Sequence, residues 1–472
     1  MRKLLIIFIV SLFVMAYGAP ASAVDIKVSG QYYAAGVFES NHSLRDEAGR
    51  NLLTGSGKAS STAFVAQRLR LQPEFKIAEG LTLTTRFDAL EKKWGDTNWA
   101  QNGIYSYDNT NRPVDRTAAN LTNPLTTGAN IRTQENIEWE RAYVDFNTAV
   151  GRFLVGYFNT INYGTDFLNS SWSRPGVEYM YPMGPWTFGA RWEHVAEGGS
   201  SGIGSAGANL LYAEADFDIY SVMTDYRWKA GAAGIQVQYY HDSFNDYDRG
   251  GYIRKLYTFN PYVRWTAGPL FLESELWYGM GDWQDFRDSR QDVDLDAWAF
   301  YANGKYTMGP WYVGALVGYE SGDDPSTTDK QEGSVFSTLW LGKNWDPFLL
   351  MFNDAINTWV GNWSGYAASA SAISTFEQNC LLWKVYAGWN VTPKLRLEAG
   401  YGMATADEAP ANFVDKDYGS EFDIYAIYKI YDNLSYMVGY GYWWVGDYFK
   451  GTSSSNQVDN NYLVTHKLTL TF

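Results

Sequence analysis

Apolar and polar residues alternate with a period of two along most of the chain. The pattern is clearest in LTLT at residues 81–84, IQVQY at 235–239, LRLEA at 395–399 and LTLTF at 468–472. Such alternation places successive side chains on opposite faces of a β-strand. Because helical periodicity is nearly absent, the pattern predicts an all-β protein.

The alternating segments are about 10 to 14 residues long, a length that suits a tilted strand crossing a bilayer. Short turns are expected near residues 78–80, 147–149, 183–185, 231–233, 267–269, 308–310, 346–347, 391–393 and 431–433. Long polar connections are expected at 40–60, 94–134, 159–175, 320–332, 358–377 and 446–460. This alternation is typical of a transmembrane antiparallel up-and-down β-barrel with tight periplasmic turns and long outer loops.

Nine short turns imply about 20 strands. Two of these turns have weak sequence support, so we predict 18 strands within a range of 16 to 20. A soluble β-sandwich or propeller is the alternative. A propeller needs a blade-length sequence period, which the chain lacks. A sandwich does not explain why Trp and Tyr recur at the ends of the strands.

The N-terminal residues predict export. Arg2 and Lys3 precede an apolar stretch at residues 4–17, and Ala21-Ser22-Ala23 has the pattern of a cleavage site. We therefore expect a signal peptide at residues 1–23, a single transmembrane β-barrel domain at 24–472 and a location in the bacterial outer membrane. An uncleaved helical anchor is the alternative, but the apolar stretch is short for a bilayer span.

Composition narrows the function classes. The net charge of −15 argues against nucleic acid as a partner, because phosphates attract basic surfaces. A single cysteine, Cys380, excludes an intramolecular disulfide framework and cysteine-rich metal sites. The four histidines show no metal-ligand spacing, so we expect no metal and no cofactor.

The motif MGPW occurs at Met183 and again at Met308. Gly-Pro is a turn signal, and Trp favours the membrane–water interface. We therefore expect Trp186 and Trp311 to begin strands at the aromatic girdle, and Phe472 to end the last strand there.

Several segments resemble the strands of Gram-negative general porins. They are KVSGQ at residues 27–31, FVAQRLRLQPEFKIAEGLTLTTRFDAL at 64–90, ERAYVDF at 140–146 and GRFLVGYFNTINYGTDFLNSSW at 151–172, together with the final strand ending on Phe472. The resemblance implies a water-filled channel for passive diffusion of small hydrophilic solutes and ions. It also implies a homotrimer in contact with outer-membrane lipid and a C-terminal strand recognised by barrel-assembly machinery.

In general porins a long loop folds into the barrel and narrows it, so the resemblance implies an inward-folded constriction loop here. Either residues 159–175 or the longer connection at 94–134 fits that role. The chain is longer than a typical general porin, which allows extra strands or longer loops.

The alternation of polar and apolar residues indicates which charged side chains should line the constriction. The basic candidates that should point inward are Arg68, Arg70, Arg86, Arg141 and Arg191, and the acidic candidates facing them are Asp166 and Glu178. Opposed charges at the narrowest section set selectivity. In the alternative reading these charges only solvate the lumen. The sign of ion preference stays open, because the net charge favours cations whereas the early arginines favour anions.

Three other functions remain open at this stage. A substrate-specific channel for sugars, carboxylates or amino acids would use a luminal aromatic track, with candidates Tyr240, Trp443 and Tyr312. A sheath around an electron-transfer partner is the second. An enzyme is the third and is not expected, since His241 beside Asp242 and Ser243 is the single local candidate for catalysis.

An acidic stretch at residues 292–296 begins like a calcium loop but lacks Gly at the sixth position and Glu at the twelfth. We expect Asp292, Asp294 and Asp296 to form an inward-facing stripe at the pore mouth, and calcium binding is the alternative.

Overall fold

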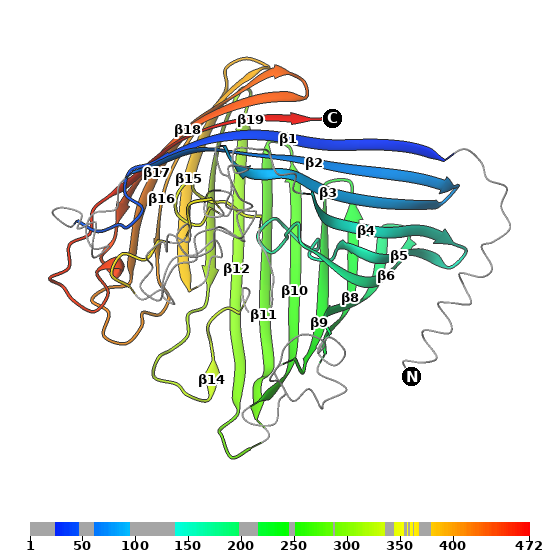
Figure 1. The fold of residues 1–472 in the computed structure, drawn as a ribbon, viewed down its shortest axis with the longest axis horizontal. Coiled ribbons are helices and arrows are strands. Elements are labelled where there is room, and N and C mark those ends of the chain that lie inside the picture. Colours follow the sequence, from blue (N-terminus) through cyan, green and yellow to red (C-terminus); the bar gives the residue numbers. More distant parts are fainter. Residues whose placement is uncertain are drawn as a thin grey trace, which may run out of the picture.

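The alternating segments form long strands that pair in sequence order and close into an 18-strand antiparallel β-barrel (Figure 1). The structure is a computed structural model. It describes residues 24–46, 61–94, 137–197, 216–244, 251–286, 288–335, 344–353, 356, 359–361, 363–367 and 379–472. The expected signal peptide and most of the connection at 94–134 lie outside these residues.

The first nine strands of the barrel are β1 (Asp25–Glu39), β2 (Thr62–Ala78), β3 (Leu81–Lys93), β4 (Ile137–Thr148), β5 (Gly151–Asn159), β6 (Ser173–Met183), β7 (Trp186–Ala196), β8 (Phe217–Trp228) and β9 (Gly231–Asp242). The other nine are β10 (Tyr252–Ala267), β11 (Leu270–Phe286), β12 (Val293–Met308), β13 (Trp311–Glu320), β15 (Cys380–Asn390), β16 (Leu395–Thr405), β17 (Asp417–Tyr431), β18 (Leu434–Val445) and β19 (Asn461–Thr471).

Two short elements lie outside this ring. The strand β14 (Lys330–Gln331) pairs in parallel with β12, and η4 (Asp447–Lys450) is a 3₁₀ turn between β18 and β19. No helix among the described residues has the length and apolar character needed to cross a membrane.

Eight of the nine expected short turns join neighbouring strands, and the prediction of 18 strands is confirmed. The turn expected at Asp346-Pro347 is wrong. These two residues belong to a segment that folds into the barrel, where Pro347 is buried and its carbonyl oxygen accepts a hydrogen bond from Lys384.

The two faces of each strand differ as the alternation predicts. On β18 the residues Tyr436, Val438, Tyr440 and Trp444 are exposed on the outside, whereas the alternate residue Trp443 is buried inside. An apolar exterior contacts lipid, and lipid offers no hydrogen bonds to an open sheet edge. The exterior therefore requires a closed ring.

The MGPW tryptophans point outward from the first positions of their strands. Trp186 contacts the ring of Tyr226 with centroids 4.7 Å apart, and Trp311 stacks on Trp389 at 4.5 Å. Both tryptophans lie at the short-turn end of the barrel, where the sequence placed them. Their role in an aromatic girdle stays a prediction.

The predicted inward acidic stripe on β12 is wrong. Leu295 and Ala297 are the buried residues that face the interior, so the alternate Asp294 and Asp296 lie on the outer face with Trp298. Asp296 is 3.8 Å from the ammonium group of Lys330. A charged side chain that faces lipid is costly, which places this end of the outer face outside the hydrocarbon region.

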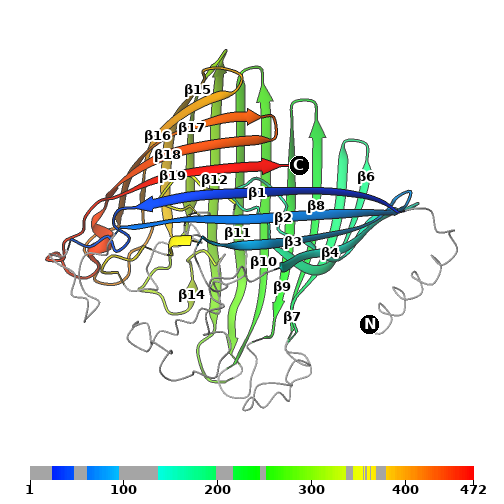
Figure 2. The ribbon, with the colours of Figure 1, turned by 45° about the horizontal axis from the view of Figure 1, so that its top comes forward.

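The barrel closes where β1 pairs with β19 (Figure 2). The amide of Gly30 donates to the carbonyl of Phe472 at 2.8 Å, and the amide of Phe472 donates back to Gly30 at 3.1 Å. A Cβ atom at Gly30 would lie 2.6 Å from the carbonyl oxygen of Arg70 and 2.6 Å from the Phe472 ring. Glycine is therefore needed for Phe472 to lie across the seam.

We predict that Gly30→Ala weakens closure and lowers the stability of the folded barrel by about 1–3 kcal/mol, the usual cost of overpacking. Urea unfolding, followed by the heat-modifiable migration of the barrel on SDS gels, measures the change. Gly304→Ala is the matched control, because its Cβ meets only the flexible Leu272 side chain at 3.2 Å. Equal stability of the two variants would contradict the account.

Candidate functional site

The connection between β5 and β6 folds into the barrel. Phe167 is fully buried, and its ring stacks on Tyr301 of β12 with centroids 5.3 Å apart. Residues 160–172 thus run from β5 and β6 across the interior towards β11 and β12 (Figure 1). Of the two sequence candidates for a constriction loop, this is the one that the structure describes.

Three hydrogen-bonding groups hold this loop in place. Arg191 of β7 donates to the carbonyl of Thr160 at the start of the loop. At the tip, the amide and hydroxyl of Thr165 donate to Glu275 Oε2 of β11 at 2.8 and 2.5 Å. At the end, Arg141 of β4 donates to the carbonyl of Ser171 at 3.2 Å. Buried polar groups satisfied in this way fix the loop against three parts of the wall.

A second segment, residues 344–353, also folds inward, which the sequence did not predict. The amides of Leu349, Leu350 and Met351 donate to the buried carboxylate of Glu421 on β17 at 3.0, 2.7 and 2.8 Å. Three such bonds compensate the burial of one carboxylate.

The two inward segments meet inside the barrel. The amide of Asn344 donates to the carbonyl of Asn169 at 2.8 Å, and the ring centroids of Phe167 and Trp345 are 5.1 Å apart. Together the segments contact β4, β7, β11–β12 and β15–β18. The wall formed by β19 and β1–β4 carries a different surface.

That wall is basic. Arg70 binds Asp88 through two hydrogen bonds of 2.7 and 2.6 Å and also contacts Glu140 at 3.0 Å. Arg86 lies 2.7 Å from the same Glu140 carboxylate. Arg68 lies further away, at 3.7 Å from Asp88. The structure therefore brings together four predicted residues, Arg68, Arg70, Arg86 and the loop anchor Arg141, on three adjacent strands.

The sequence prediction missed one basic residue of this wall. Lys467 of β19 lies with its ammonium group 4.6 Å from the ring centroid of Tyr33, and the guanidinium of Arg68 covers the same ring at 5.2 Å. Inward alternation from the buried Thr465 is the signal that identifies Lys467.

Two exposed carboxylates lie on the inward segments. Asp166 is exposed beside the buried Phe167, and Asp346 is exposed beside the buried Trp345. The strands β3 and β12 are nine places apart (12 − 3) in a ring of 18, so the loop tip at β12 lies opposite the arginines. The exposed carboxylates of the inward segments thus lie across the remaining interior from a wall whose arginines already contact Asp88, Glu91 and Glu140.

The structure places two other candidates differently from the sequence hypothesis. Arg191 Nε donates directly to Glu178 Oε2 at 2.5 Å, and their side chains are 1% and 5% exposed. They are neighbours on β6 and β7 rather than opposed groups. Arg191 also donates to Asn162 at 2.9 Å, so this ion pair lies under the base of the loop.

The predicted luminal aromatics point inward but are covered. Tyr240 and Trp443 have no exposed surface, and Tyr312 is 8% exposed. Trp443 packs edge-to-face against Trp363 and Phe449 from the outer connections. Rings buried to this extent offer little surface on which a solute can stack.

The structure does not bring the side chains of the catalytic candidates His241, Asp242 and Ser243 together. Asp242 faces inward and pairs with Arg254 at 2.9 Å, whereas His241, the preceding residue on β9, points to the opposite face with Tyr239. Ser243 hydrogen bonds to Asp216.

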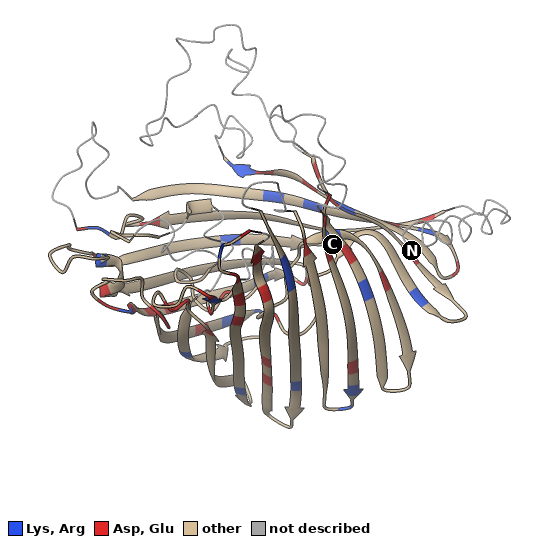
Figure 3. Cartoon of the chain, turned by 90° about the horizontal axis from the view of Figure 1, so that it is seen from below, with Lys and Arg blue, Asp and Glu red and all other residues tan. Residues whose placement is uncertain are grey.

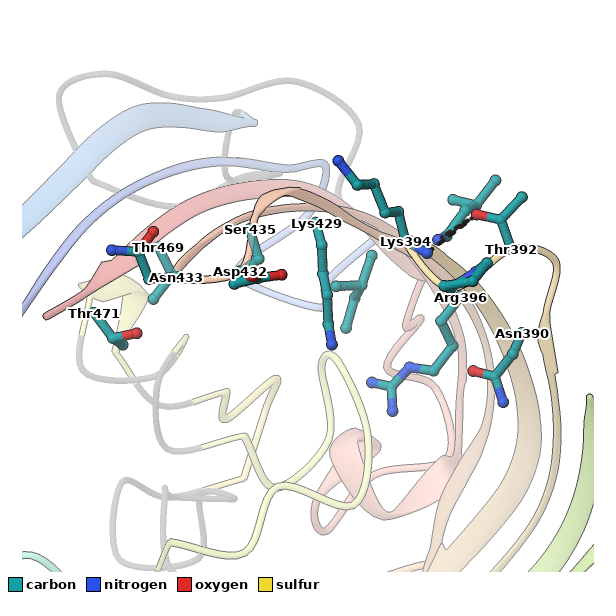
Figure 4. A pocket seen from close by; sticks show the side chains of 13 residues that line it. Asn390, Thr392, Lys394, Arg396, Lys429, Asp432, Asn433, Ser435, Thr469 and Thr471 are labelled. Atoms are coloured by element: carbon teal, nitrogen blue, oxygen red, sulfur yellow. Dashed lines mark hydrogen bonds between the residues drawn. The ribbon is translucent and has the colours of Figure 1, made fainter.

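Lys, Arg, Asp and Glu are interspersed along the strands rather than separated into two halves (Figure 3). A polar cavity of about 400 Å³ lies at the short-turn end between β15 and β19. Arg396 and Lys429 extend into it beside Asn390 (Figure 4).

Comparison with known proteins agrees with this architecture. The structure resembles OccAB2 of Acinetobacter baumannii, with 11% identity, a TM-score of 0.51, and coverage of 94% of this chain and 98% of that chain. OpdL of Pseudomonas aeruginosa has 11% identity and a TM-score of 0.50, and the match covers 95% of this chain and 98% of that chain. OccK9 (OpdG) of the same organism has 12% identity and a TM-score of 0.50, and the match covers 95% of this chain and 99% of that chain. This is a bacterial outer-membrane barrel fold.

No protein-family model matches the chain, and no curated protein is significantly similar to it in sequence. The comparisons therefore show the fold of the chain.

We predict that Glu275→Ala releases the loop tip, because it removes the acceptor of both Thr165 bonds and of the Asn260 amide at 2.9 Å. A buried amide left unsatisfied costs about 1–3 kcal/mol. Single-channel recording should show a larger and noisier open current.

Glu273→Ala is the matched control on the same strand. Glu273 faces the interior but accepts its hydrogen bonds from Tyr301 and Asn303, not from residues 160–172. Equal current noise in the two variants would refute the anchoring role of Glu275.

Proposed function

We propose that this protein is a porin of the outer membrane that forms a water-filled channel for passive diffusion of small hydrophilic solutes and ions. The supporting observation is that charged side chains inside a closed, externally apolar barrel keep solvent-exposed surface. Arg68 is 21% exposed, Arg70 17% and Glu140 26%. Charges in a lumen retain such surface where water reaches them.

The proposed constriction lies between the basic wall and the two inward segments. Arg68, Arg70 and Lys467 would face Asp166 and Asp346 across it. Opposed charges orient a polar solute and determine which ions pass. Arg86 and Arg141 belong to the same wall, with Arg141 also anchoring the loop.

The rival functions have less support. The buried aromatic rings do not support a stacking track for one class of solute. The inward segments occupy space that a sheath around a second protein needs, and the separation of His241 from Asp242 gives an enzyme no local support. A homotrimer, a signal peptide and recognition of Phe472 by barrel-assembly machinery stay predictions of the sequence.

Planar-bilayer recording of the purified, refolded protein tests the proposal. We expect stepwise currents that grow linearly with voltage and do not saturate with salt concentration. Absence of any conductance from protein shown to be folded by its heat-modifiable migration would overturn the channel function. Saturable block by one solute class would instead favour a substrate-specific channel.

Reversal potentials in the same recordings locate the constriction. Arg68→Gln should shift the permeability ratio towards cations by about fivefold, since one charge about 4 Å away is worth about 1 kcal/mol in water. Arg152→Gln is the control: it removes the same charge at the short-turn end, where Arg152 pairs with Asp145. An equal shift in both variants would place the selective region elsewhere.

A further inference from the structure

A cluster of one histidine and three carboxylates lies at the long-connection end of β7 and β8, away from the proposed constriction. His194 is on β7 and is paired in register with Asp218 on β8. Glu197 follows the end of β7, and Asp216 directly precedes β8. The pairing of β7 with β8 therefore brings these four residues together at the ends of the two strands.

The ligand atoms in this cluster converge. His194 Nδ1 lies 2.8 Å from Asp218 Oδ1, and His194 Nε2 lies 3.2 Å from Glu197 Oε2. One ligand atom each from His194, Glu197 and Asp216 lies within 4.8 Å of the others. Atoms this close can share one cation after small side-chain rotations, since metal–ligand bonds to nitrogen and oxygen are about 2.0–2.2 Å long.

Asp218 orients the imidazole. Its Oδ1 accepts a hydrogen bond from the Trp192 indole at 3.1 Å as well as contacting His194 Nδ1, and the residue is 6% exposed. A carboxylate bound to one imidazole nitrogen is the usual outer partner of a metal-ligating histidine, because it sets the tautomer and the ring orientation.

With Nδ1–H donated to Asp218, the lone pair of Nε2 faces the carboxylate of Glu197. Two acceptors at 3.2 Å repel each other unless a positive group lies between them. A proton on Nε2 or a cation meets this requirement. A proton is shared by two atoms only, whereas Asp216 supplies a third ligand atom at the same place, as a bound metal ion requires.

We propose that His194, Glu197 and Asp216 bind a divalent transition-metal ion of the Zn²⁺ type, with Asp218 as a positioning residue. Imidazole with carboxylate oxygens is a donor set for zinc and its neighbours, whereas calcium and magnesium prefer oxygen alone. The ion would link the ends of β7 and β8 at the barrel rim.

The sequence did not reveal this site because the ligands are not regularly spaced. Glu197 is 3 residues from His194 (197 − 194), but Asp216 is 22 residues away (216 − 194). The β7–β8 register brings them together.

Calorimetric titration of Zn²⁺ into untagged, chelator-treated, refolded protein tests the proposal. We expect one Zn²⁺ per chain in the wild type and loss of this binding in His194→Ala. Asp218→Asn should weaken the affinity about 10- to 100-fold, as loss of an outer partner does. Zinc-edge X-ray absorption should show one imidazole nitrogen among oxygen ligands.

His466→Ala is the control, because His466 lies on β19 against the Tyr436 ring and is not part of the cluster. Glu197→Gln is a second test, since its side chain is 49% exposed and its loss should not prevent folding. The proposal is overturned if the wild type binds no zinc. It is equally overturned if His194→Ala and Glu197→Gln both bind zinc like the wild type, which would leave the cluster as a protonated imidazole between carboxylates.

Discussion

Pairing of β1 with β19 is the interaction on which the rest of the structure depends. In the hydrocarbon region no water is available to an open sheet edge, so each strand needs two neighbours. The mutual hydrogen bonds of Gly30 and Phe472 begin this pairing at one end of the seam. Once the ring closes, alternation assigns every second side chain to the interior. The charged groups of Arg68, Arg70 and Glu421 then point inward, and water, opposite charges or inward segments must compensate them.

The barrel meets that need in two different ways around its circumference. Along β15–β18 the segment 344–353 covers the wall, and its amides compensate Glu421. Along β2–β4 the arginines pair with carboxylates of the same wall and keep part of their surface exposed. Burial on one side and partial exposure on the other divide the interior into a packed part and a solvent-accessible part. The proposed channel follows the second.

The sequence predicts well what depends on alternation and poorly what depends on long connections. The strand number, the inward arginines and the outward Trp186 follow from a period of two, because a membrane imposes opposite environments on the two faces of a strand. That rule fails at Asp294 and Asp296, where β12 extends into water and both faces accept charge. The alternation makes no prediction for Asp346, because an inward loop is held by partners that are far away in the chain. Arg191 is also far from its partner Thr160 in the chain, at 31 residues. Their contact makes Arg191 an anchor of the loop rather than the pore charge that the sequence predicted.

The central claim is that residues 160–172 border the path taken by ions. Thiol modification tests this directly, with Asp166→Cys in a Cys380→Ser background, since Cys380 is buried and the chain has no other cysteine. A water-soluble cationic thiol reagent added during bilayer recording should reduce the open current of this variant. It should leave Asp324→Cys, on an exposed outer connection, unchanged. Unaltered current after complete modification of Asp166→Cys would contradict the account.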